Sequence, residues 1–95
     1  MPRAIWNGQV IAESEAVEDL AGTAYFPPAA LKPEFFRDSD HTSVCGWKGT
    51  ANYFSINAGG AINTDAAFYY PEPLEAAAAI RDRIAFWKGV EVMDL

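Results

Sequence analysis

An Asn-Gly dipeptide, Asn7-Gly8, is the sequence feature that most constrains the fold. It lies between two short apolar segments, residues 4–6 and 9–12. Asparagine followed by glycine accepts positive φ at both central positions of a type I′ turn, and the twist of that turn matches the twist of two adjacent antiparallel strands. The sequence therefore predicts a β-hairpin over residues 4–12.

The clearest single strand is predicted over residues 50–57, where alternate side chains point to opposite faces. One face carries Thr50, Asn52, Phe54 and Ile56, and the other carries Ala51, Tyr53, Ser55 and Asn57. We assign the face with Phe54 and Ile56 to the core. Gly59-Gly60 predicts a turn into another strand over residues 61–70. The end of that strand is apolar on both faces, so we expect it inside a sheet.

Shorter elements are expected on either side of these strands. Residues 23–26 are predicted to form a strand that Pro27-Pro28 closes, with one helical turn over residues 29–31. Residues 35–40 are interpreted as a loop, and residues 42–45 as a short strand before a tight turn. These short, turn-bounded segments are typical of a mainly β domain.

One short helix is predicted near the C-terminal third of the chain, over residues 74–80, because Pro73 precedes an alanine-rich run. Residues 84–87 are expected to pair with residues 90–93 in a further hairpin. Three large side chains of the terminal segments are assigned to the core: Trp6, Phe86 and Trp87.

Composition limits the function classes. The 95 residues predict one domain over residues 1–95, with 13 acidic and 7 basic side chains and a formal charge of −6. That charge opposes a phosphate backbone, so we expect no nucleic-acid partner. No apolar run approaches the roughly 20 residues that cross a bilayer, so we expect no membrane partner and a cytoplasmic location. One cysteine and one histidine predict no disulfide, no metal and no cofactor.

The segment from His41 to Phe54, HTSVCGWKGTANYF, resembles the centre of an uncharacterised, mainly bacterial family, the domain of unknown function numbered 427. Further matching segments lie at residues 7–14, 25–27, 66–73 and 84–86. The resemblance implies a β-tent-like fold, two antiparallel sheets that meet at an angle, as in methionine sulfoxide reductase type B and the thalidomide-binding domain of cereblon. This chain has Phe68 where the family usually has tryptophan, and it lacks the paired cysteines that hold zinc in several β-tent relatives.

Some members of that family carry a nucleotidyltransferase-like label, which the residues support weakly. Asp38-Ser39-Asp40 has the spacing of a metal-binding carboxylate pair, but no Gly-Ser turn precedes it and no glycine-rich phosphate loop is present. We interpret these residues as a solvated loop.

Cys45 and Lys48 are the candidate catalytic residues. A nearby cation lowers the pKa of a thiol, and Lys48 follows Cys45 across a turn. His41 is a weaker candidate base, because four extended steps would put its backbone about 13 Å from that of Cys45. The alternative is that Cys45 is a small buried side chain and His41 a loop or capping residue.

The same turn is the candidate ligand site. Cys45, Trp47, Lys48 and Tyr53 are expected around one concavity, with Lys48 at its rim to orient an anionic or carbonyl-bearing ligand. Tyr69 and Tyr70 point to opposite faces of a strand, so at most one of them contributes. Tyr69 is included with the candidate residues, and Tyr70 is the alternative.

Three functions stay open, and the first is ranked highest because the residues of a pocket are visible and a full catalytic set is not. The first is a small-ligand binding module around residues 45–53. The second is a thiol-dependent or nucleotidyltransferase-like enzyme that uses Cys45 and Lys48. The third is a protein-interaction or oligomerisation domain with exposed aromatic contacts. The sequence leaves the ligand and the oligomeric state undetermined.

Overall fold

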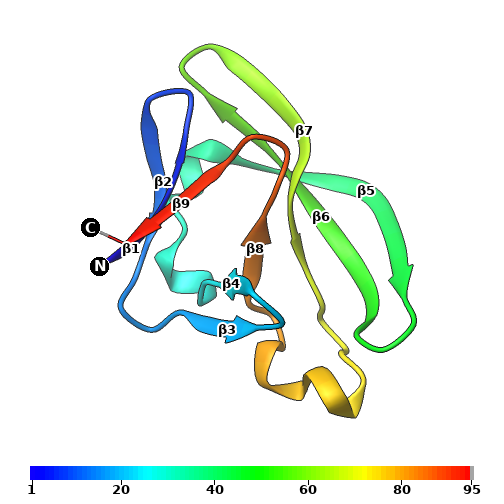
Figure 1. Cartoon of the computed structure of the whole chain (residues 1–95). Helices are drawn as coiled ribbons and strands as arrows, with labels where there is room; N and C mark the ends of the chain where they lie inside the picture. The colour runs from blue at the N-terminus through cyan, green and yellow to red at the C-terminus, as the bar shows by residue number, and fades with distance from the viewer. Residues whose placement is uncertain (95) are drawn as a thin grey trace.

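The computed structural model describes residues 1–94 and consists mainly of antiparallel β-strands (Figure 1). The strands are β1 (Pro2–Trp6), β2 (Gln9–Glu13), β3 (Glu18–Leu20), β4 (Thr23–Tyr25), β5 (Phe36–Cys45), β6 (Gly49–Ala58), β7 (Ala61–Tyr69), β8 (Ile84–Phe86) and β9 (Glu91–Asp94). Three short 3₁₀ helices connect them: η1 (Pro28–Ala30), η2 (Pro33–Phe35) and η3 (Glu75–Ile80). The predicted mainly β, antiparallel class is confirmed.

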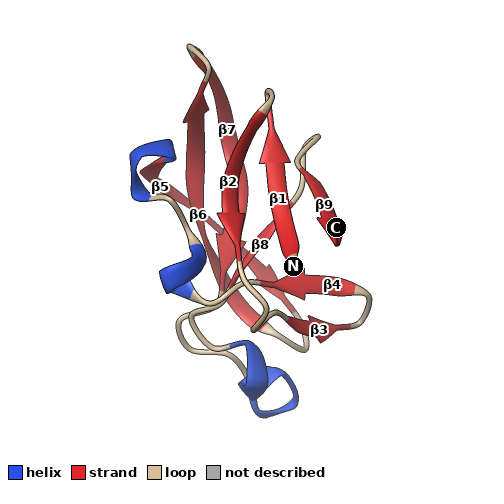
Figure 2. Cartoon of the chain, turned by 90° about the vertical axis from the view of Figure 1, so that its left-hand side faces the viewer, coloured by secondary structure: helices blue, strands red, loops and turns tan. Residues whose placement is uncertain are grey.

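The strands form three sheets. A three-stranded sheet has the order β2-β1-β9, and a four-stranded sheet has the order β5-β6-β7-β8. Two sheets were predicted, and the short β3-β4 ribbon is an additional one. The N-terminal hairpin is confirmed, because Asn7 and Gly8 have φ of 50° and 77° between β1 and β2. Strand β9 pairs with β1, so the two ends of the described chain lie side by side (Figure 2).

The first hydrophobic cluster lies between the two larger sheets. Its buried residues are Ala4, Ile11, Ala12, Phe26, Ile56, Ala58 and Ala66. Ile56 on β6 thus faces the core, as predicted. Its neighbour Phe54 is only half-buried.

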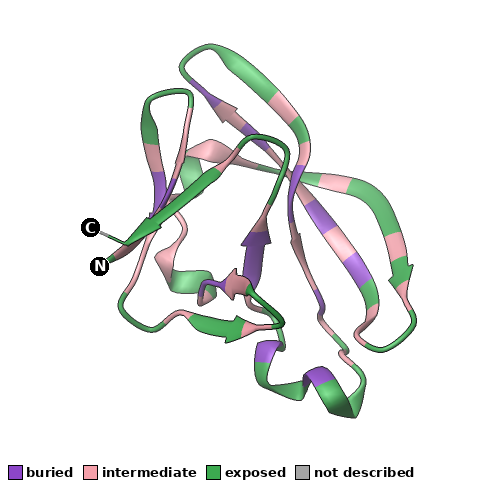
Figure 3. Cartoon of the chain, viewed as in Figure 1, coloured by how far each residue is buried: buried purple, intermediate pink, exposed green. Residues whose placement is uncertain are grey.

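The second hydrophobic cluster lies between the four-stranded sheet, the β3-β4 ribbon and η3. Its buried residues are Tyr25, Ala51, Tyr53, Tyr70, Ala77, Ile80 and Ala85. Ala51 and Tyr53 belong to the face of β6 that was not assigned to the core. Strand β6 therefore buries one face in its first half and the opposite face in its second half, and Figure 3 shows the resulting bands of buried residues on this sheet.

Several local predictions were wrong. Residues 36–40 are part of β5 and not a loop. Residues 36–38 pair with β6, a register irregularity follows Asp38, and a strand at the edge of a sheet accepts exposed polar side chains. Residues 84–86 and 91–94 do not pair with each other, since β8 joins β7 and β9 joins β1. Trp87, assigned to the core, is 49% exposed. The helix over residues 75–80 is present, but it is a 3₁₀ helix with a kink at Ala77.

Among the described residues, no helix is long and apolar enough to span a membrane.

Candidate functional site

The turn between β5 and β6 is held in place by the segment that precedes η3. The Leu74 backbone N–H donates a hydrogen bond to the Lys48 carbonyl at 2.9 Å. Gly49 has φ of 114°, and a Cβ there would lie 3.2 Å from the Glu72 carbonyl oxygen. Glycine suits both the positive φ and this close approach. These contacts hold the β5-β6 turn against the segment before η3. From this turn the Lys48 side chain reaches the rings of Tyr25 and Tyr70 in the second hydrophobic cluster.

The Lys48 ammonium group lies among three aromatic rings. Nζ donates a hydrogen bond to the Tyr25 hydroxyl at 2.9 Å. It lies 5.1 Å from the centroid of the Trp47 ring, 5.5 Å from that of Tyr25 and 5.9 Å from that of Tyr70. Distances below about 6 Å give a favourable interaction between a cation and an aromatic ring. The ammonium is thus oriented by one hydroxyl and three rings.

Tyr53 on β6 belongs to the same hydrophobic cluster as Tyr25 and Tyr70. Its hydroxyl forms a 2.7 Å hydrogen bond with the Ser43 hydroxyl on β5. The His41 ring lies against the Tyr53 ring, with 4.6 Å between centroids. His41 was expected in a loop, but it lies in β5 and contacts Tyr53. No hydrogen bond between His41 and Cys45 is formed among the described residues, so the two do not form a Cys-His dyad.

Tyr70 is also buried in this region, with 6% of its surface exposed. Burial, followed by the proximity of Tyr25, Cys45 and Tyr53, raises the pKa of Tyr70 to about 12. No described residue forms a hydrogen bond with its hydroxyl group. The hydroxyl oxygen is not among the fully buried, unpaired polar atoms of the described residues, so it stays in contact with solvent.

Cys45 lies at the end of β5 and is half-buried. The nearby backbone N–H groups of Trp47 and Lys48 lower the pKa of the thiol. Burial acts in the opposite direction, and the Lys48 charge adds a smaller lowering effect. The tight turn therefore stabilises the thiolate form mainly through its backbone.

We call these residues the aromatic-lysine site: Tyr25, Cys45, Trp47, Lys48, Tyr53 and Tyr70. The structure brings together the predicted Cys45, Trp47, Lys48 and Tyr53, and it adds Tyr70, the stated alternative. Tyr69 points to the opposite face of the sheet, where its ring stacks on Phe54 at 4.8 Å, so it is not part of this group. Tyr25 was missed, because only the pairing of distant segments brings β4 beside Lys48.

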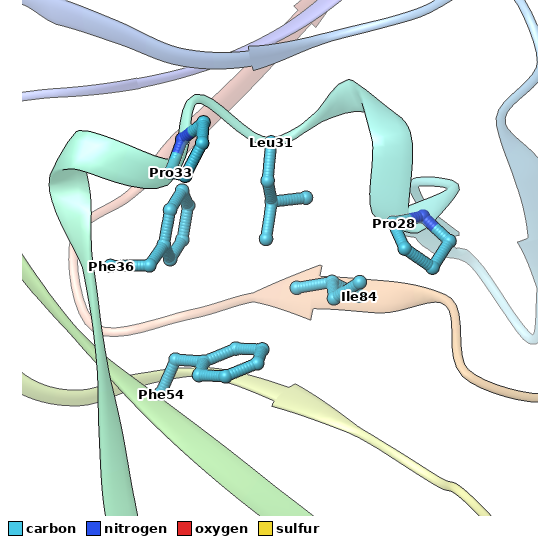
Figure 4. A pocket seen from close by; sticks show the side chains of 6 residues that line it. All are labelled: Pro28, Leu31, Pro33, Phe36, Phe54 and Ile84. Atoms are coloured by element: carbon cyan, nitrogen blue, oxygen red, sulfur yellow. The ribbon is translucent and has the colours of Figure 1, made fainter.

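A pocket of about 260 Å³ lies away from this site, beside the first hydrophobic cluster. Its lining is Pro28, Leu31, Pro33, Phe36, Phe54 and Ile84, as Figure 4 shows. None of the predicted site residues lines this pocket. The concavity expected around Cys45 and Tyr53 thus differs from the pocket that the structure shows.

The remaining candidates lie apart from the site. Asp38 and Asp40 are exposed on β5, and the Ser39 hydroxyl between them donates a hydrogen bond to the Asp65 carboxylate. Within residues 1–94, no three His, Cys, Asp or Glu side chains are grouped so that they could hold a metal ion. The described Asp38-Ser39-Asp40 segment therefore has no third ligand nearby.

The chain is a small, mainly β protein in which one half-buried lysine lies among three aromatic rings. Residues 2–95 match the family described as "Domain of unknown function (DUF427)". The chain therefore belongs to the DUF427 family, as its sequence motifs predicted. No curated protein matches the chain.

Proposed function

We propose that this protein binds small molecules that carry an anionic group on an apolar or aromatic body, and that the aromatic-lysine site holds them. The observation that carries the proposal is the Lys48 ammonium, fixed by the Tyr25 hydroxyl beside the ring of Tyr70, whose own hydroxyl forms no hydrogen bond with a described residue. The two groups provide a charged donor and a neutral donor that a carboxylate or a similar oxyanion would accept.

The charge of Lys48 supports an anionic ligand. The chain has a formal charge of −6, yet no ion pair of the described residues includes Lys48. A cation without a carboxylate partner attracts an anion more strongly where neighbouring rings exclude water. Lys48 is half-buried against three such rings.

The surroundings of Lys48 support an apolar or aromatic body for the same ligand. Trp47 is 43% exposed and Leu74 is 49% exposed, and both border the β5-β6 turn. Ligand sites commonly combine apolar walls with a few polar groups that fix orientation. Trp47 and Leu74 would supply the apolar walls of such a site, and the Lys48 ammonium would supply the polar group.

A thermal-shift experiment tests the proposal with a defined probe set. Benzoate, phenylacetate and indole-acetate are compared with their neutral primary amides. A compound that binds only the native state raises Tm by mass action. We expect the carboxylates to raise Tm and the amides to have a much smaller effect.

Three variants give the controls. Lys48→Met should remove the preference for carboxylates, and Tyr70→Phe should weaken it. Lys88→Met is the matched control, because the Lys88 ammonium also lies over a tryptophan, 5.9 Å from the Trp87 ring, but outside the site. The proposal fails if no carboxylate raises the Tm of the unmodified chain, or if Lys48→Met keeps the full effect.

A further inference from the structure

We propose that the pocket beside the first hydrophobic cluster is a second ligand site, which binds an uncharged bicyclic aromatic molecule. Three of its lining residues come from residues 28–33, and one each comes from β5, β6 and β8 (Figure 4). None of them belongs to the aromatic-lysine site. The inference therefore goes beyond the proposed function and does not depend on Lys48.

The wall formed by residues 28–33 is anchored to both larger sheets. Before this segment, Phe26 exchanges two backbone hydrogen bonds with Ile84 on β8, at 2.7 and 2.8 Å. Within it, the Lys32 backbone N–H donates a hydrogen bond to the Ile11 carbonyl on β2 at 2.9 Å. Each of its two 3₁₀ helices starts with a proline, which restricts φ. A wall that is already in place reduces the conformational cost of binding a ligand.

The opposite wall contains an oriented aromatic ring, that of Phe54. This ring stacks on the Tyr69 ring, with 4.8 Å between centroids and 22° between planes. The Phe36 ring meets it edge-on, with 6.1 Å between centroids and 70° between planes. Aromatic pairs in such arrangements contribute more than their buried area alone. The two phenylalanine rings therefore favour an aromatic occupant.

The volume and the lining of the pocket define the size and the charge of that occupant. The pocket has a volume of about 260 Å³. An apolar cavity of about 150 Å³ holds one benzene ring, so this pocket has room for two fused rings. All six lining side chains are hydrocarbon. A carboxylate or a primary amide would lose hydrogen bonds to water there without gaining a partner. Indole has the matching size, and its single N–H lies on the ring edge, where it can face solvent.

Methyl NMR of the full chain tests the site with indole as the probe. A bound aromatic ring shifts the resonances of the methyl groups that it contacts. We expect indole to shift the methyl resonances of Leu31 and Ile84 along saturable curves. Ile62, which is 69% exposed on β7, should stay unchanged. Benzene should bind about tenfold more weakly, because it buries less apolar surface. The inference is overturned if neither Leu31 nor Ile84 shifts saturably, or if benzene binds as tightly as indole.

Variants of the lining check the location. Leu31→Trp places a bicyclic side chain in the pocket, so added indole should no longer shift Ile84. Ile62→Trp is the matched control and should keep indole binding. Phe54→Leu keeps the lining apolar but removes the oriented ring, so indole should bind about three- to tenfold more weakly. This second variant carries the test if Leu31→Trp does not fold. Unchanged indole affinity in folded Leu31→Trp or in Phe54→Leu overturns the inference.

Competition with benzoate separates this inference from the proposed function. Benzoate is a ligand of the aromatic-lysine site in that proposal, so saturating benzoate should leave the affinity for indole unchanged. Displacement of indole by benzoate would mean that the two share one site, and would overturn the inference. Indole binding without any effect of the carboxylates on Tm overturns the proposed function alone. Carboxylate binding without the Leu31 and Ile84 shifts overturns the second site alone.

Discussion

The Lys48 ammonium donates a 2.9 Å hydrogen bond to the hydroxyl of Tyr25, a residue 23 positions earlier in the chain. Tyr25 is fully buried at the end of β4, whereas Lys48 lies in the turn between β5 and β6. The bond therefore connects the β3-β4 ribbon to the four-stranded sheet. It also places the ammonium in a fixed position among the rings of the aromatic-lysine site.

Lys48→Met should lower the free energy of unfolding by about 1–3 kcal/mol, because it leaves the buried Tyr25 hydroxyl without a partner. This loss exceeds the change within about 0.5 kcal/mol that is usual for a surface substitution. Denaturant unfolding measures it. In a Tyr25→Phe background the hydroxyl is absent, so Lys48→Met should cost clearly less. Equal costs in the two backgrounds would contradict the role of this hydrogen bond.

Tyr70 should ionise well above the ordinary pKa of a tyrosine, about 10. Burial raises its pKa to about 12, so phenolate absorbance of the native protein should show one late step that Tyr70→Phe removes. The native state favours the neutral phenol. Its contribution to stability is therefore complete below the unfolded pKa, about 10, and is lost as pH rises toward about 12. A native titration in which Tyr70→Phe removes an early step would contradict this assignment.

Gly59→Ala should destabilise the fold more than Gly60→Ala by about 1 kcal/mol, the value of one hydrogen bond. Both glycines have positive φ, 61° and 78°, so the backbone strain is matched. Only at Gly59 would a Cβ meet a neighbour, the Asn7 Nδ2 atom at 2.6 Å. That amide donates a hydrogen bond to the Ala58 carbonyl and so joins two hairpins. Equal melting temperatures for the two variants would exclude this packing.

Ile56→Ala should cost about 2–5 kcal/mol, because Ile56 is fully buried between the two larger sheets and its removal leaves a cavity. Ile62 on the adjacent strand β7 is the matched control, since it is 69% exposed. Ile62→Ala should change stability by less than about 0.5 kcal/mol. Denaturant unfolding of both variants checks the prediction, and similar costs would mean that the core lies elsewhere.

Chelator treatment should leave the melting temperature unchanged. A structural metal contributes directly to folding free energy, so its removal would lower Tm. The grouping of ligands that such a site needs is missing from residues 1–94. A clear fall in Tm, together with stoichiometric metal in elemental analysis, would refute this expectation.

Local chemistry made several elements predictable from the sequence. Asn7-Gly8 and Gly59-Gly60 have the positive φ values that hairpin turns need, and both turns are present. The apolar end of β7 lies between β6 and β8, as an element apolar on both faces requires. These features depend on neighbours within a few residues, so the sequence contains the information directly.

Pairing between distant segments was not predictable in the same way. Lys88 and Gly89 do form a turn with positive φ, but the strands on its two sides join different sheets. The mainly polar residues 36–40 form part of a strand because β6 supplies backbone partners to residues 36–38. A local pattern specifies a turn or a strand, whereas the choice of partner depends on which distant edge is available.

The aromatic-lysine site likewise combines residues that local sequence brings together with residues that only tertiary packing brings together. The sequence by itself placed Cys45, Trp47 and Lys48 in one turn and Tyr53 on the following strand, because β-strand alternation and turn geometry act over short distances. Only the tertiary structure selected Tyr70 over Tyr69 and brought Tyr25 to the Lys48 ammonium. The reason is physical: a side chain's face follows from strand periodicity, but what covers that face is decided by the packing of sheets far apart in the chain.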